Sequence, residues 1–220
     1  QPTGRARLLL GVPRCQVDVA YLDLPPAKDD ELPELVSHQI AMEATDTAED
    51  RILDFLPIDR PGDETRRVCA VSILPALADT MNQECRQLTS QPESLVFQPT
   101  ATAQLFHRLT PQIQEPLLLV NLVDRDVDLM LCEQGTVHYT RGFVVSTDAQ
   151  TELAEQLAVE IRRTLAVAPA ETQSVSHIYL FGTLAEQDLL VRNLTETLDL
   201  PVSLLNPFDT LPQEQDPVPT

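Results

Sequence analysis

Three consecutive strands are predicted in residues 117–145, and this stretch constrains the fold more than any other. It reads LLLVNLVDRDVDLMLCEQGTVHYTRGFVV. Apolar runs at 117–123, 126–133 and 136–145 are separated by two tight polar turns, as in strands that follow one another through a sheet. We therefore expect a three-stranded meander at this point of the chain.

The rest of the second half alternates helices with strands. A long helix is expected at 148–167, where Leu153, Leu157, Ile161 and Leu165 recur every four residues. A strand at 175–182, a helix at 185–198 and a closing strand at 201–206 follow. This order predicts an α/β layer fold with a mixed sheet.

The first half alternates in the same way and predicts a second lobe of related build. We expect strands at 5–13, 16–25, 51–58, 66–75 and 94–99, and helices within 27–44, at 76–89 and at 100–109. Asp29 and Asp30 mark the start of the first helix, where Pro33 fits only in the first turn. The predicted division is a first lobe at 1–110, a second at 111–208 and a Pro-rich, acidic, disordered tail at 209–220.

The charge balance excludes several classes of partner. Lys and Arg number 15 against 34 Asp and Glu, which gives a formal net charge of −19. Such a chain repels polyanions, so we expect no nucleic acid and no anionic lipid surface as partner. The acidity serves either solubility alone or the attraction of a basic partner segment. The four Cys and four His are scattered without metal-ligand spacing, so no metal site is expected.

Four motifs in the second half carry a resemblance to a known family. They are LVNLVDRDVDLMLCEQGTVHYTRGFVV, LAEQLAVEIRRTLAV, SHIYLFGT and LDLPVSLLNPF. In this order and spacing the chain resembles the PilM family of type IV pilus assembly proteins, within the actin-like ATPase superfamily, over residues 5–208. The cytoplasmic L component of type II secretion is a close relative. The resemblance implies actin-like (ribonuclease H-like) α/β lobes with mixed sheets flanked by helices.

The resemblance also places a nucleotide site, which is degenerate in this sequence. It falls on Asn121, Arg125, Gly182 and Thr183. Asn121 stands where the family has an acid, and the turn 123–126 has two carboxylates and no glycine. Family members also have a first phosphate hairpin before the segment matching 5–13, and a small helical subdomain after 146. Neither is found in the sequence, so the expected fold is degenerate and truncated.

Two of these features have an alternative structural reading. Asp124, Asp126 and Asp128 form either a divalent-cation site or the solvent-facing side of a strand, because alternate residues share one face. Gly182 and Thr183 either contact an adenine or form a strand-to-helix turn with a capping residue.

By resemblance, the expected function is that of a non-catalytic cytoplasmic scaffold or adaptor. It would join a type IV pilus or type II secretion-like inner-membrane assembly without ATP, Mg²⁺ or another cofactor, peripheral to the membrane. In the family, the cytoplasmic tail of an inner-membrane partner docks in a groove as an extended peptide. The alternative is an actin-like switch that retains MgATP near Asn121, Arg125 and Gly182. Self-association into an oligomer is a third possibility.

Overall fold

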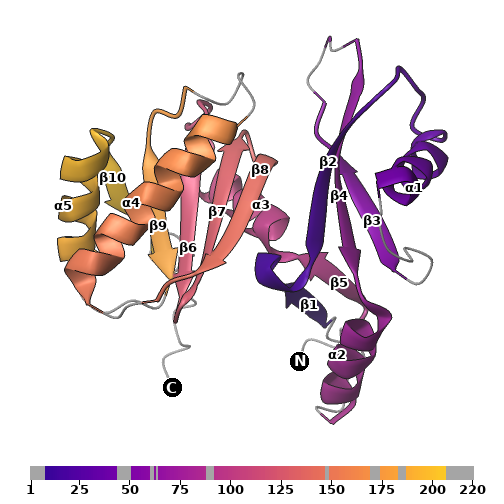
Figure 1. The fold of residues 1–220 in the computed structure, drawn as a ribbon, viewed down its shortest axis with the longest axis horizontal. Coiled ribbons are helices and arrows are strands. Elements are labelled where there is room, and N and C mark those ends of the chain that lie inside the picture. Colours follow the sequence, from indigo (N-terminus) through magenta and orange to yellow (C-terminus); the bar gives the residue numbers. More distant parts are fainter. Residues whose placement is uncertain are drawn as a thin grey trace, which may run out of the picture.

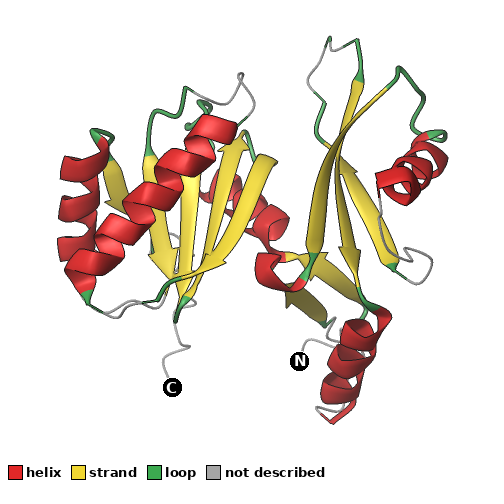
Figure 2. Cartoon of the chain, in the orientation of Figure 1, coloured by secondary structure: helices red, strands yellow, loops and turns green. Residues whose placement is uncertain are grey.

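The chain folds into two α/β parts that lie side by side, as Figure 1 shows. The computed structural model describes residues 8–43, 51–59, 62, 64–87, 92–146, 149–168, 174–182 and 187–206. Residues of the second half form one large sheet, and residues of the first half form two small ones (Figure 2). The predicted tail at 209–220 lies outside the described residues.

The large sheet contains the predicted meander at its centre and edge. Its five strands run in the order β10-β9-β6-β7-β8. Strands β6, β7 and β8 pair antiparallel, whereas β9 and β10 run parallel to β6, so the sheet is mixed as predicted. The strands are β6 (Leu117–Val123), β7 (Asp126–Glu133), β8 (Thr136–Val144), β9 (Ile178–Gly182) and β10 (Val202–Leu204).

Helices cover both faces of this sheet. Helices α4 (Gln150–Val167) and α5 (Gln187–Leu198) pack on one face, where the predicted stripe Leu153, Leu157 and Ile161 is buried. Helix α3 (Gln98–Leu109) packs on the opposite face through Ala103 and Phe106. Because both faces are covered, β6 is a nearly continuous apolar run instead of an alternating one.

The first half differs from the second in its sheets. Strands β1 (Leu9–Val12) and β5 (Ser94–Phe97) form a parallel pair. Strands β2 (Asp18–Leu24), β4 (Arg66–Ile73) and β3 (Ile52–Pro57) form an antiparallel sheet in the order β2-β4-β3. Helix α1 (Leu32–Glu43) packs on one face of that sheet, and helix α2 (Pro75–Gln87) follows β4. The order of strands and helices alone does not reveal which strands pair.

Several boundaries differ from prediction by a few residues. Helix α1 begins at Leu32, three residues after Asp29, which forms an ion pair with Arg66 at 2.9 Å. Pro33 lies in the first turn as predicted. A short 3₁₀ helix, η1 (Arg14–Gln16), was not predicted. Since α3 packs on the large sheet, residues of the first half contribute to the second core, and the division near residue 110 stays a prediction.

A tyrosine joins the two halves at the edge of the large sheet. The ring of Tyr21 in β2 stacks on Tyr139 of β8, with 5.3 Å between ring centroids. Its hydroxyl oxygen accepts a hydrogen bond from the backbone N–H of Thr140 at 2.5 Å. β8 is an edge strand, so this N–H has no ladder partner on that side. The contact therefore both satisfies an edge donor and fixes β2 beside β8.

Strands β6 and β9 approach unusually closely at Gly182. This residue has a φ of +130°, and a Cβ at its position would lie 1.8 Å from the backbone oxygen of Leu122. No side chain fits there without moving a central strand. Gly182 is thus required by the sheet itself.

We expect Gly182→Ala to lower the free energy of unfolding by about 3 kcal/mol or more, because the methyl group strains the backbone and displaces β6. Urea denaturation of the purified protein measures this. Gly11→Ala is the matched control: it also adds a methyl group within a strand, but no atom lies within 4 Å of the new Cβ. Equal stability of the two variants would contradict the close approach.

Candidate functional site

The structure brings three of the predicted nucleotide residues, Asn121, Arg125 and Gly182, to one end of the large sheet. Asn121 and Gly182 lie on neighbouring strands, since Asn121 pairs with Phe181 and Leu122 pairs with Gly182. Arg125 is exposed in the turn beyond β6, and its carbonyl oxygen accepts the N–H of Val145 at 2.8 Å. Thr183 lies outside the described residues. Nucleotide binding by these residues stays a prediction.

The β6–β7 turn has chemistry that suits phosphate poorly. Asp124 adopts a φ of +54°, a conformation that Asn and Asp tolerate better than other side chains. Asp124 and Asp126 are both exposed at the turn, so two carboxylates face the solvent where phosphate oxygens would have to approach. Asn121 is buried, only 7% exposed, so little of its side chain is accessible to a ligand.

The third aspartate of the predicted cation site has a different role. Asp128 is buried on β7, and it accepts a hydrogen bond from the backbone N–H of Arg14 in η1. The stem of Arg14 lies over Gly142 of β8, beside the Asp128 carboxylate. Asp128 thus belongs to the contact between the halves, and no described set of three His, Cys, Asp or Glu side chains is grouped closely enough to hold a metal ion.

Burial controls the protonation of Asp128. It raises the pKa of this carboxyl from 3.8 to about 6, although the N–H and the charge of Arg14 act in the opposite direction and Asp126 adds to the increase. Cys15, also in η1, faces the same carboxylates, and its own pKa is raised, chiefly by burial. The contact between η1 and β7 therefore contains a carboxylate that is costly to ionise.

We expect Asp128 to make the protein less stable as pH rises through about 6. The folded state binds this proton more tightly than the unfolded state, so its contribution is present near pH 4 and is lost by pH 7. Asp128→Asn should remove this contribution. Between pH 4 and pH 7 the free energy of unfolding of the variant should therefore rise, relative to that of wild type, by on the order of 2–3 kcal/mol.

Urea denaturation at a series of pH values checks this difference. Asp188→Asn on α5 is the control, since it removes a carboxylate from an exposed position away from this contact. Parallel pH profiles for wild type and Asp128→Asn would contradict the assignment.

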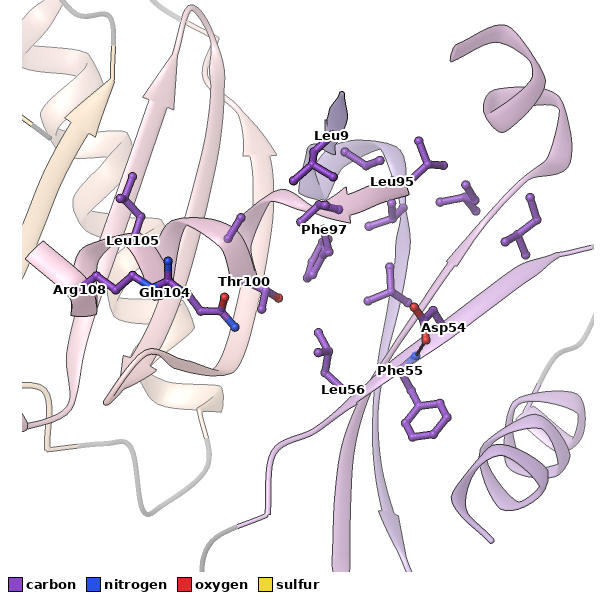
Figure 3. Close-up of a pocket in the computed structure, with 17 residues that line it drawn as sticks. Leu9, Asp54, Phe55, Leu56, Leu95, Phe97, Thr100, Gln104, Leu105 and Arg108 are labelled. Atoms are coloured by element: carbon purple, nitrogen blue, oxygen red, sulfur yellow. Dashed lines mark hydrogen bonds between the residues drawn. The ribbon is translucent and has the colours of Figure 1, made fainter. Parts of the chain in front are cut away.

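A large apolar groove lies between the antiparallel sheet of the first half and helix α3 (Figure 3). Its volume is about 690 Å³, within the range of pockets that bind ligands. One wall is the face of β3 and β4 that α1 does not cover, and the other walls come from β1, β5 and α3. The aliphatic lining consists of Leu9, Val12, Val17, Ile52, Leu56, Val71, Ile73, Leu95, Val96, Ala101 and Leu105.

Several of these side chains are unusually exposed. Leu9 is 54% exposed, Ile52 48%, Leu105 43% and Leu56 37%. Single exposed apolar residues are ordinary on protein surfaces, but four around one groove form a continuous apolar surface. Burying them against a partner contributes a favourable transfer free energy of roughly 25 cal/mol for each Å² removed from water, before the entropy cost of association is subtracted. The groove is therefore the described surface best suited to binding.

Sequence reasoning did not find this groove. Its walls come from residues 9–17, 52–56, 71–73 and 95–108, which no local pattern connects. One signal was present: β3 is apolar on both of its faces, with Ile52 and Leu56 on one and Leu53 and Phe55 on the other, although only one face packs on α1. Two apolar faces on an edge strand indicate that the second is covered by something else.

Known structures resemble the chain in fold. No protein-family model and no curated protein sequence matches it. A chain of a PilM–PilN type IV pilus biogenesis complex matches with a TM-score of 0.76 and 17% identity, over 94% of this chain and 72% of that one. A Bacteroides thetaiotaomicron protein of unknown function with the actin-like ATPase fold matches with a TM-score of 0.50 and 13% identity, over 91% and 69%.

The cytoplasmic domain of EpsL, an inner-membrane component of the Vibrio cholerae type II secretion system, matches with a TM-score of 0.49 and 12% identity, over 86% of this chain and 72% of that one. Together with the two-part architecture, the matches with TM-scores of 0.76 and 0.50 define the class of fold. The chain has an actin-like ATPase fold. Within that class its fold is similar to PilM, so the predicted PilM-like fold is confirmed. Within the described residues, no helix is both long enough and apolar enough to span a membrane.

Proposed function

We propose that the protein is a non-catalytic cytoplasmic adaptor of a type IV pilus or type II secretion-like inner-membrane assembly. It binds a short, extended cytoplasmic segment of a membrane-anchored partner in the groove of about 690 Å³. The observation that carries the proposal is this groove, whose rim leaves Leu9, Ile52, Leu56 and Leu105 more than a third exposed.

The shape of the groove favours a peptide as occupant. An extended segment places alternate side chains on opposite sides, so one set enters an apolar groove while the backbone keeps its polar groups near water. The walls are built on strands β3 and β4 and on helix α3, which are regular elements that hold their side chains in fixed positions.

Fold similarity and charge support the choice of partner. The solved structure that matches with a TM-score of 0.76 is a PilM–PilN complex of type IV pilus biogenesis. A formal net charge of −19 attracts basic segments, such as those found next to the cytoplasmic ends of membrane spans, and speeds their association.

The adaptor acts without nucleotide turnover in this proposal. The β6–β7 turn presents Asp124 and Asp126 where a phosphate-binding loop needs backbone N–H groups, and Asn121 is buried. Gly182 is accounted for by the close approach of β9 to Leu122. An actin-like switch that retains MgATP is the alternative, and a direct binding measurement separates the two.

Groove binding predicts that Leu56→Asp weakens peptide binding at least about tenfold, because the charge must be desolvated in an apolar wall. The probes are fluorescein-labelled synthetic peptides that tile the cytoplasmic segments of the inner-membrane pilus and secretion assembly proteins of the same organism, measured by fluorescence anisotropy. The control is Leu189→Asp on α5, an exposed leucine outside the groove. Absence of binding to wild type, or equal loss in both variants, would refute the proposal.

Absence of nucleotide binding predicts an unchanged melting temperature in millimolar MgATP. A ligand at about 100 times its dissociation constant stabilises a protein by about 2.7 kcal/mol, which differential scanning fluorimetry detects readily. The full-length gene product is the sample. A raised melting temperature that Arg125→Ala abolishes would instead establish the switch, with a functional β6–β7 turn.

A further inference from the structure

Two charged side chains stand on different walls of the apolar groove. Among the described residues that line it, only Asp54 and Arg108 are charged. Asp54 belongs to β3 and Arg108 to the last turn of α3, and Figure 3 shows them on opposite sides of the open space. The groove therefore has an acidic side and a basic side around an aliphatic centre.

Arg108 has no ion-pair partner among the described residues, although the protein has a large excess of carboxylates. Five other described arginines pair with an aspartate or glutamate: Arg51, Arg66, Arg67, Arg141 and Arg163. Arg108 is exposed, and its guanidinium, which carries five N–H donors, is available to a carboxylate from outside.

Asp54 is also open to a partner. One carboxylate oxygen accepts the backbone N–H of Phe55 at 2.8 Å, and the second oxygen has no partner among the described residues. No described cation forms an ion pair with this exposed carboxylate. Its position among Ile52 and Leu56 gives a single negative charge to an otherwise apolar wall.

We propose that Asp54 and Arg108 select the docked segment and fix its direction. The segment has apolar side chains at its centre, a basic residue that meets Asp54 and an acidic residue that meets Arg108. This inference rests on the proposed adaptor function and adds the charge pattern of the partner. Because the two charges differ in sign, a segment bound in the reverse direction meets a like charge at each end.

The occupant of the groove is a peptide and not a lipid or an acyl chain. An acyl chain has no cation to place beside Asp54, and the anionic headgroups that would suit Arg108 are repelled by the net charge of −19. A peptide carries both signs on one chain, separated by apolar residues. Charge complementarity is therefore the property that distinguishes the occupants.

Three synthetic peptides test the assignment. All have acetylated and amidated ends and the same alternating leucine–valine centre. One carries lysine at one end and glutamate at the other, the second carries lysine at both ends, and the third carries glutamate at both ends. We expect the mixed-charge peptide to bind wild type more tightly than either of the other two in fluorescence anisotropy. The titrations are repeated at several salt concentrations, so that the salt dependence of each dissociation constant is known.

Charge reversal should change this order in a specific way. Arg108→Glu should favour the two-lysine peptide over the mixed one, and Asp54→Lys should favour the two-glutamate peptide, each by about two- to fivefold. The controls are Arg192→Glu and Glu196→Lys on α5, which change the net charge by the same amounts at exposed positions away from the groove.

The possible results separate this inference from the proposed function. One possible result is that all three peptides bind wild type and Leu56→Asp weakens their binding, while Arg108→Glu has the same effect as Arg192→Glu. In that case the groove binds peptides but the two charges do not select them. If none of the peptides binds wild type, the adaptor function and the charge pattern both fail. Switched preference in Arg108→Glu and Asp54→Lys, without a switch in the α5 controls, establishes the assignment.

Discussion

The burial of strand β6 over all but its last residue organises the second half of the molecule. Leu118, Leu119, Val120 and Leu122 are not exposed at all, because the strand has a neighbour on each edge and a helical layer on each face. A strand of this kind leaves no freedom of register: a shift by one residue would exchange the side chains that meet α4 with those that meet α3. The positions of β7, β9 and the helices follow from it.

The same constraint decides what the end of the sheet can do. Asn121 is drawn into the interior with its apolar neighbours, and Gly182 is required where β9 meets Leu122. Packing thus accounts for Asn121 and Gly182, and the turn beyond them carries carboxylates. The molecule has the actin-like architecture, while its large apolar groove lies in the other half, between α3 and the antiparallel sheet.

The two halves are joined by specific polar contacts at the β8 edge. Tyr21 satisfies the N–H of Thr140, and the N–H of Arg14 reaches the buried carboxylate of Asp128. These contacts place β2 and η1, and with them one end of the groove at Val12 and Val17, relative to the large sheet. The geometry of the groove therefore depends on the contact between the halves.

The sequence by itself determined the order and type of the elements, since periodicity, prolines and tight turns are local properties. It placed the β6–β7–β8 meander, the stripe of α4 and the first turn of α1 close to where they lie. Only the tertiary structure decided that α3 packs on the second sheet, that Asp128 lies under η1 and that Asp54 and Arg108 face one groove. Those relations join residues that are far apart in the sequence through burial and charge, and no local pattern in a chain encodes which distant surfaces meet.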